Sequence, residues 1–548
     1  MSLSNAVSLP PELLKPHRVR WWGLPLIVVA ALVMLPLVVI LFSWLTPAPE
    51  VWEHLLETEF RRLMINTLSL LLGVGICVAV LGVGLAWLVA TCEFPGRRWL
   101  DWSLVLPLAI PPYVLAFIFL GVFGYAGPVQ TLWRSIVGTG GTFPDIRSTC
   151  GVIVVMVLVL YPYVYMLARN AFLSQGRELM DAARLLGASP WRAFWHVALP
   201  MARPAIAAGT ALALMETLAD FGAVSVFNFD TFTTAIYKSW FGFFNLSAAA
   251  QLASLLLLVV FLGLWGESKA RGRARTYQTP PRIIERFELT GTAKWAATTV
   301  CCTVLFVAFV IPIGQLIMWT AGRLQDVDHR YWSLVARTLA LGASAATLAS
   351  LLALLVAFGR RQLKEAPWQR AAVRVASLGY ALPGSVLAVG IMLAFAFIDQ
   401  QLINPLQALL GLPPKQWLLG SLAALILAYI VRFFSVAYGP VQSSLEKIRP
   451  SFQEAAHTLG ANQWQVLCRV YLPLLRPGLL SAGLLVLVDT MKEMPATLLM
   501  RPFGWDTLAV RVYEMTAEGE WERAALPALT LVLISLIPVL SIMRGSRR

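Results

Sequence analysis

The segment that decides the fold is Trp21–Trp44, WWGLPLIVVAALVMLPLVVILFSW, which contains no acidic or basic residue. A bilayer core about 30 Å thick needs about 20 apolar residues of helix at about 1.5 Å each. The run is also too long for the apolar region of a cleaved signal peptide, which has about 7–15 residues. We therefore expect Trp21–Trp44 to be an uncleaved first transmembrane helix.

The whole chain has the same apolar character. Its 548 residues are 58% hydrophobic and 13% charged, with a mean hydropathy of +0.72, whereas soluble proteins have about 45–50% apolar and about 25% charged residues. The same length test predicts about twelve spans, near residues 22–44, 66–90, 102–123, 151–171, 205–226, 246–265, 295–319, 334–358, 373–397, 418–438, 478–499 and 525–543. We therefore expect an all-α polytopic membrane protein embedded in a lipid bilayer.

Basic residues set the expected orientation. If the N-terminus is cytoplasmic, twelve crossings return the C-terminus to the same side, and the cytoplasmic segments hold 30 of the 43 Lys and Arg residues. The positive-inside rule favours this topology, with both termini in the cytoplasm. The formal net charge of +14 is then explained without a nucleic-acid partner, since no soluble basic domain is present.

The two halves of the chain resemble each other. A polar, basic linker, 267–293, separates a first repeat, 1–266, from a second repeat, 294–548. Four pairs of landmarks recur at offsets of 271 to 273, namely Thr67/Thr338, Pro111/Pro383, Asp181/Glu454 and Glu216/Asp489. Each half has six predicted spans, so we expect two parallel six-helix repeats related by an axis along the membrane normal, with a pathway at their interface.

A duplicated cytoplasmic loop carries the strongest functional signal. The first copy, in the loop near 172–203, reads Asp-Ala-Ala-Arg-Leu-Leu-Gly over 181–187, and the second, near 440–476, reads Glu-Ala-Ala-His-Thr-Leu-Gly over 454–460. Leu-Pro follows each glycine at the same distance. Alanine favours helix and allows close approach, an acid favours a helix N-terminus, and glycine can end the helix in a left-handed conformation.

These loops resemble the EAA loop of binding-protein-dependent ABC importer permeases. Asp181 replaces the family's Glu, and Val197 and Val470 replace its Ile. The resemblance implies that each loop forms a short coupling helix in a cleft of an ATPase subunit. The implied ATPase-coupling residues are Asp181, Ala182, Ala183, Gly187, Glu454, Ala455, Ala456 and Gly460.

The sequence lacks the ATPase itself. The phosphate-binding pattern GxxxxGK[ST] is absent, and so is any Gly-Lys pair. We therefore predict that the chain is not an enzyme, binds no cofactor, and works with two copies of a separate ATP-binding subunit. The resemblance also implies a periplasmic or lipid-anchored substrate-binding protein as a partner, and a place in the bacterial inner membrane.

Two acidic pairs follow the loops. Glu216 and Asp220 lie four residues apart on one predicted helix, as do Asp489 and Glu493 on its counterpart, so each pair shares a helix face. A charge at mid-bilayer costs about 2.5–3.5 kcal/mol, but about 18 Å of helix between Pro204 and Glu216 places these acids in the outer half, where the cost is smaller. Because symmetric acids at the interface of the repeats would favour a cation, we interpret the four acids as lining a substrate pathway. Lys492 departs from the symmetry and offsets part of this negative charge. The alternative is that the acids cap helices or bridge to neighbours, and we assign no metal ligands.

Further segments narrow the substrate. The stretches 216–222, 229–237, 240–242, 489–497 and 501–509 resemble those of the fused permeases of ferric iron importers. Ferric iron is a hard cation that suits carboxylate and phenolate oxygen, but the acidic pairs suit thiamine or a polyamine equally well. An ABC importer of thiamine or a polyamine therefore stays open, as do an ion-gradient-driven secondary transporter and a non-transporting receptor.

Overall fold

The computed structural model describes all residues except 1–19, 47, 139–142, 175–191, 193, 272–285, 364–366 and 546–548. The described chain forms two compact units. The smaller unit comprises residues up to 35, 343–380 and 429–486, and the larger comprises 36–342, 381–428 and 487–548. Each unit draws on both halves of the sequence, so the compact units are not the two sequence repeats.

Helices account for nearly all of the described structure. Those of the first half are η2 (Arg20–Gly23), α1 (Leu24–Phe42), η3 (Ser43–Leu45), α2 (Pro49–His54), η4 (Leu55–Glu59), α3 (Phe60–Thr91), α4 (Arg97–Ser103), η5 (Leu106–Ala109), α5 (Pro112–Phe123), α6 (Pro128–Val137), α7 (Thr149–Ser174), η6 (Phe194–Ala198), α10 (Leu199–Ala219), α11 (Gly222–Val226), α12 (Phe232–Phe241) and α13 (Leu246–Arg271).

Those of the second half are α14 (Thr292–Leu305), η7 (Phe306–Val310), α15 (Ile311–Ala321), η8 (Leu324–Asp326), α16 (His329–Gln362), α17 (Pro367–Ser377), η9 (Leu378–Ala381), α18 (Gly384–Ile398), η10 (Asp399–Ile403), α19 (Asn404–Leu409), α20 (Leu422–Glu446), α21 (Ser451–Thr458), α22 (Gln463–Val466), η11 (Leu467–Tyr471), α23 (Leu472–Leu474), α24 (Arg476–Lys492), α25 (Pro495–Met500), α26 (Leu508–Ala517) and α27 (Trp521–Gly545).

The predicted membrane architecture is confirmed. Eleven helices among the described residues are long and apolar enough to cross a bilayer. A twelfth span is counted when the segments Gln463–Leu474 and Arg476–Lys492, which meet at a 74° bend, are taken together. The protein is therefore an all-α polytopic membrane protein.

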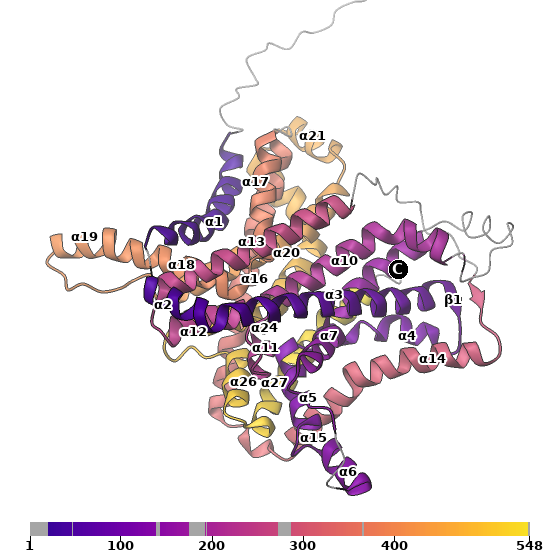
Figure 1. The fold of residues 1–548 in the computed structure, drawn as a ribbon. Helices are drawn as coiled ribbons and strands as arrows, with labels where there is room; N and C mark the ends of the chain where they lie inside the picture. Colours follow the sequence, from indigo (N-terminus) through magenta and orange to yellow (C-terminus); the bar gives the residue numbers. More distant parts are fainter. Residues whose placement is uncertain are drawn as a thin grey trace, which may run out of the picture. The chain divides into compact units, whose positions relative to one another are not determined.

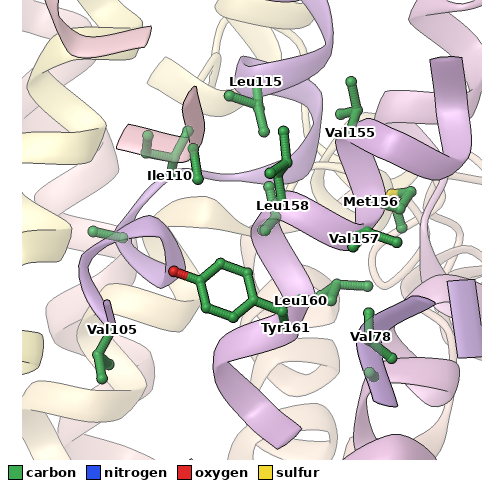
Figure 2. Close-up of a cluster of buried hydrophobic side chains, with 14 of the residues drawn as sticks. Val78, Val105, Ile110, Leu115, Val155, Met156, Val157, Leu158, Leu160 and Tyr161 are labelled. Carbon is green, nitrogen blue, oxygen red and sulfur yellow. The ribbon is translucent and has the colours of Figure 1, made fainter. Parts of the chain in front are cut away.

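In the larger unit, α3, α7 and α10 lie side by side (Figure 1). Figure 2 shows part of the buried core, where Val78 of α3 and Leu115 of α5 lie near Leu158 and Tyr161 of α7. The Tyr161 hydroxyl donates a hydrogen bond to the carbonyl oxygen of Leu104 at 2.7 Å. This bond satisfies a buried hydroxyl and a carbonyl that lies between two helices, as apolar surroundings require.

Several predicted spans are broken rather than continuous. The span near 102–123 divides into α4, η5 and α5, and the span near 373–397 divides into α17, η9 and α18. Pro111 and Pro383 stand immediately before α5 and α18 and are their N-cap residues. Proline lacks an N–H and disfavours helix in the residue before it, which explains a break at the same place in both halves.

A second pair of breaks follows α10 and α24. After α10 ends at Ala219 the chain restarts as α11 at Gly222, and after α24 ends at Lys492 it restarts as α25 at Pro495. Non-helical backbone at membrane depth is tolerated where it is buried in protein or lines a water-filled cavity. The breaks therefore interrupt membrane-crossing helices at equivalent places in the two halves.

The end of the linker is tied to the loop after α3. Strand β1 (Cys92–Glu93) pairs in parallel with strand β2 (Phe287–Glu288). Glu93 also forms ion pairs with Arg97 at 3.0 Å and with Arg286 at 3.9 Å. Most of the linker lies outside the described residues.

Candidate functional site

The second duplicated loop contains the short helix α21, and Glu454 lies in its first turn. Gly460 follows the helix at a φ of +82°. Its N–H donates to the carbonyl of His457 at 3.0 Å, and the N–H of Ala461 donates to the carbonyl of Ala456 at 3.0 Å. This pair of bonds is a Schellman motif, so the left-handed glycine expected at the end of this helix is present.

Side-chain hydrogen bonds anchor α21 within the smaller unit. The Gln453 amide donates to Gln362 Oε1 at 2.9 Å, and its own Oε1 accepts from the Tyr471 hydroxyl at 3.0 Å. Arg361 donates to the carbonyls of Leu445 at 2.9 Å and Ile448 at 2.7 Å, just before α21. The helix is thus joined to the end of α16 and to η11.

The surface formed by α21 and the residues that follow it is exposed to solvent and partly apolar. Glu454 and Ala455 are exposed, and Ala456 is half-buried. Phe452, Leu459 and Trp464 are 52%, 88% and 59% exposed. Large exposed apolar side chains on a short segment are a feature found in many interaction surfaces. The first copy, with Asp181, Ala182, Ala183 and Gly187, lies outside the described residues.

The four predicted pathway acids lie at the breaks after α10 and α24. Glu216 is on α10 and Asp489 is on α24. Asp220 Oδ2 accepts a hydrogen bond from the N–H of Val224 in α11 at 3.1 Å. Glu493 Oε1 accepts from the N–H of Ala496 in α25 at 3.1 Å. Asp220 and Glu493 each stand one residue before the N-cap and accept a hydrogen bond from an N–H in the first turn of the short helix that follows. This contact resembles the helix-capping alternative that the sequence left open for them.

The two breaks meet in the larger unit. A Cβ atom placed on Gly222 would lie 2.7 Å from Met494 Cε and 2.7 Å from Tyr113 Cβ. Gly222 begins α11, Met494 precedes α25, and Tyr113 lies at the start of α5. Three broken regions, two of them equivalent in the repeats, thus pack against one another, because the side chains of Met494 and Tyr113 approach a residue that has no side chain.

Lys492 lies at this meeting point. Its Nζ donates a hydrogen bond to the carbonyl oxygen of Leu108 at 3.2 Å, in the break before α5. The carboxylates of Asp489 and Glu216 both act on its ammonium charge. Among the described residues, no three His, Cys, Asp or Glu side chains are grouped so that they could hold one metal ion. Glu216 and Asp489 are thus near enough to Lys492 to act on its charge, and within the described part of the chain the acids do not form a preformed metal site.

Aromatic residues that the sequence did not single out surround the same breaks. The ring of Phe221 lies 5.1 Å from that of Tyr237 and 5.5 Å from that of Tyr513, measured between ring centroids. The Tyr513 hydroxyl is 2.9 Å from the hydroxyl of Ser225 in α11. Tyr113 is buried beside Glu493.

A repeat in the sequence could have identified Tyr237 and Tyr513. Tyr237 follows Asp230-Thr231 and Tyr513 follows Asp506-Thr507, each at the same spacing. The two threonines lie at equivalent places, because Thr231 forms a capping box at the start of α12 and Thr507 accepts a hydrogen bond from the N–H of Val510 at the start of α26.

The duplicated broken helices bring Lys492, Glu216 and Asp489, called here the polar centre, into an otherwise apolar bundle. This arrangement is typical of polytopic transport proteins. The chain belongs to the family described as "Binding-protein-dependent transport system inner membrane component", whose model matches residues 79–266 and 345–546. The class expected from the sequence, a multi-pass inner-membrane permease of such importers rather than an enzyme, is confirmed.

Individual relatives differ in how much of the chain they match. The chain is 27% identical over 541 residues to the Fe(3+)-transport system permease protein FbpB 2 of Haemophilus influenzae, which covers 96% of this chain and 98% of that protein. It is 34% identical over 146 residues to the molybdenum transport system permease protein ModB of Escherichia coli K12, covering 27% of this chain and 62% of that protein. A chain of the bacterial alginate ABC transporter, solved in complex with an alginate pentasaccharide-bound periplasmic protein, is 16% identical with a TM-score of 0.34, covering 46% of this chain and 94% of that one.

Proposed function

We propose that this permease imports ferric iron, driven by ATP that is hydrolysed on two copies of a separate subunit. The observation that carries the substrate is the similarity over nearly the whole chain to an Fe(3+)-transport permease. A hard cation suits a route lined by carboxylate and phenol oxygens, which is the chemistry gathered around the breaks after α10 and α24.

The cytoplasmic partner is an ATPase subunit that receives α21. The exposed Ala455 and half-buried Ala456 leave room for a close surface, while Phe452 and Leu459 offer apolar area to it. The equivalent loop around Asp181 receives the second copy. In this arrangement both termini are cytoplasmic, and a periplasmic or lipid-anchored binding protein delivers iron from the opposite side.

Movement at the loops reaches the pathway through short connections. ATP binding draws the ATPase subunits together, and α21 follows its subunit. The hydrogen bond that Gln453 donates to Gln362 and the one that it accepts from Tyr471 pass this motion to α16 and η11. Helix α24 begins shortly after the loop at Arg476 and ends at Lys492, so its rigid-body movement displaces the polar centre. Hydrolysis resets the inward-open state.

The cargo path lies between the two repeats, at the breaks where the four acids gather. Discontinuous helices supply freed backbone groups and charged side chains at the interface of repeats in many transporters. Here Glu216 and Asp489, one from each repeat, both act on the charge of the same lysine. Selectivity does not require a tight site in the permease, because the binding protein selects the cargo.

Competition during uptake tests the substrate. Vesicles that contain the permease, its ATPase and its binding protein are given radiolabelled ferric iron with an excess of thiamine or spermidine. We expect ATP-dependent accumulation of iron that neither competitor reduces. Uptake that thiamine or spermidine abolishes, or labelled thiamine accumulating in place of iron, would assign the permease to another substrate of the same importer class.

A further inference from the structure

The charges at the two equivalent breaks are not symmetric. At an offset of 273, Glu216 matches Asp489 and Asp220 matches Glu493, but Ala219 matches Lys492. Four acids therefore come from two equivalent sets, whereas the cation comes only from the second repeat. The requirements of the helices do not explain this difference, because α10 ends at Ala219 without a lysine.

The position of Lys492 suits a cation held between the repeats. It is the last residue of α24, where the free carbonyl groups of a helix favour positive charge. Its Nζ donates to the Leu108 carbonyl at 3.2 Å, and Glu216 and Asp489 act on its charge from two different helices. The ammonium group thus has a neutral oxygen and two anionic groups around it.

One further oxygen donor lies at the same breaks. Tyr113 is only 4% exposed, and its hydroxyl finds no hydrogen-bond partner within the part of the chain that the structure describes. It lies near Glu493. A buried hydroxyl without a partner is costly in an apolar environment. Together with the carboxylates, it completes a set of hard oxygen donors of the kind that polyvalent cations prefer.

We propose that Lys492 is a tethered cation that offsets the charge of Glu216 and Asp489, at a place where a hard polyvalent cation would otherwise be held. This inference rests on the proposed route of the cargo between the repeats. In the arrangement described here the ammonium offsets the charge of the two carboxylates, so a passing cation does not lodge there. Lys492 is therefore a positioning residue that prevents a tight cation-binding site from forming on the path.

Removing the positive charge of Lys492 should create that cation-binding site. Without the ammonium, the carboxylates of Glu216 and Asp489 lose the positive charge that Lys492 supplies, and they attract a polyvalent cation from solution more strongly. Lys492→Met removes both the charge and the hydrogen bond to Leu108. Lys492→Gln keeps a donor for that bond and removes only the charge, so it separates electrostatics from packing.

Terbium binding to the purified permease tests this inference. Tb³⁺ is a hard trivalent cation whose luminescence is excited through nearby aromatic rings, and the permease is placed in nanodiscs of zwitterionic lipid. We expect Lys492→Met and Lys492→Gln to bind Tb³⁺ about tenfold more tightly than the unaltered protein, or better. The gain should disappear when Glu216→Gln and Asp489→Asn are added. The matched control is Lys415→Met, since Lys415 is exposed and its contacts with Gln407 are made by backbone atoms.

Two results overturn the proposal. One is an unchanged Tb³⁺ affinity in folded Lys492→Gln protein, and the other is a gain that survives neutralisation of Glu216 and Asp489. The result is independent of the proposed function, because it concerns binding to the permease alone. If the unaltered importer does not accumulate iron while Lys492→Gln gains the site, the substrate is wrong and the tethered cation stands.

Discussion

Replacing Gly222 with alanine tests the packing at the centre of the proposed pathway. Gly222 begins α11 directly after the first of the two equivalent breaks. The added methyl carbon would lie 2.7 Å from Met494 Cε and 2.7 Å from Tyr113 Cβ. Carbon atoms in good contact are about 3.5–4.0 Å apart, so each neighbour must move by about 1 Å.

The two neighbours differ in how easily they can move. Met494 Cε is the end of a flexible side chain and can swing away, but Tyr113 Cβ is bonded to the backbone of α5. We therefore expect an overpacking cost of about 1–3 kcal/mol. This cost lowers the ratio of folded to unfolded protein by a factor of about 5 to 150.

Thermal unfolding of the purified permease in detergent measures this cost, and ATP-driven uptake measures its effect on transport. The matched control is Gly263→Ala, because a Cβ atom on Gly263 in α13 meets nothing within 4 Å. We expect Gly222→Ala to unfold at a lower temperature than the unaltered protein, and Gly263→Ala to unfold at the same temperature or higher. Equal unfolding temperatures for the two variants would refute the contact between the breaks.

Three further predictions concern the cytoplasmic loops. Ala456→Arg, made together with Ala183→Arg, should lower ATP-driven uptake about tenfold or more, because a large charged side chain prevents close docking; unchanged uptake counts against coupling through these loops. Gly460→Ala forces a left-handed conformation on a residue with a Cβ atom at a cost of about 1–2 kcal/mol, so the permease should bind its ATPase more weakly, and equal binding contradicts this. Tyr471→Phe removes the hydrogen bond to Gln453, worth about 1 kcal/mol, so hydrogen exchange in 451–458 should quicken, and unchanged exchange means that this bond does not anchor the helix.

The elements that the sequence could predict are those with local or periodic signals. Long apolar runs indicate spans because span length depends only on bilayer thickness. The repeat was visible because Pro111 and Pro383, like Gly187 and Gly460, occur at nearly constant offsets. Pro111 and Pro383 indeed precede equivalent helices, and Gly460 adopts the left-handed conformation expected of it.

Local signals did not predict the breaks after α10 and α24 or the contact between Lys492 and Leu108. A hydropathy window passes over Asp220 and Glu493 because apolar residues flank both, although Gly222 and Pro495 mark the points where new helices begin. The hydrogen bond from Lys492 to Leu108 joins residues 384 positions apart, and no local pattern predicts such a pair. The composition of the two compact units, which mix both repeats, likewise depends on long-range packing.

The measurement that bears most directly on the central claim is transport by the purified permease in sealed vesicles, with and without its ATPase subunit. Binding protein loaded with radiolabelled ferric iron is supplied on the outer side. We predict that iron accumulates only when the ATPase subunit and ATP are both present on the inner side. Accumulation driven by a proton or sodium gradient in vesicles that contain no ATPase would contradict the account.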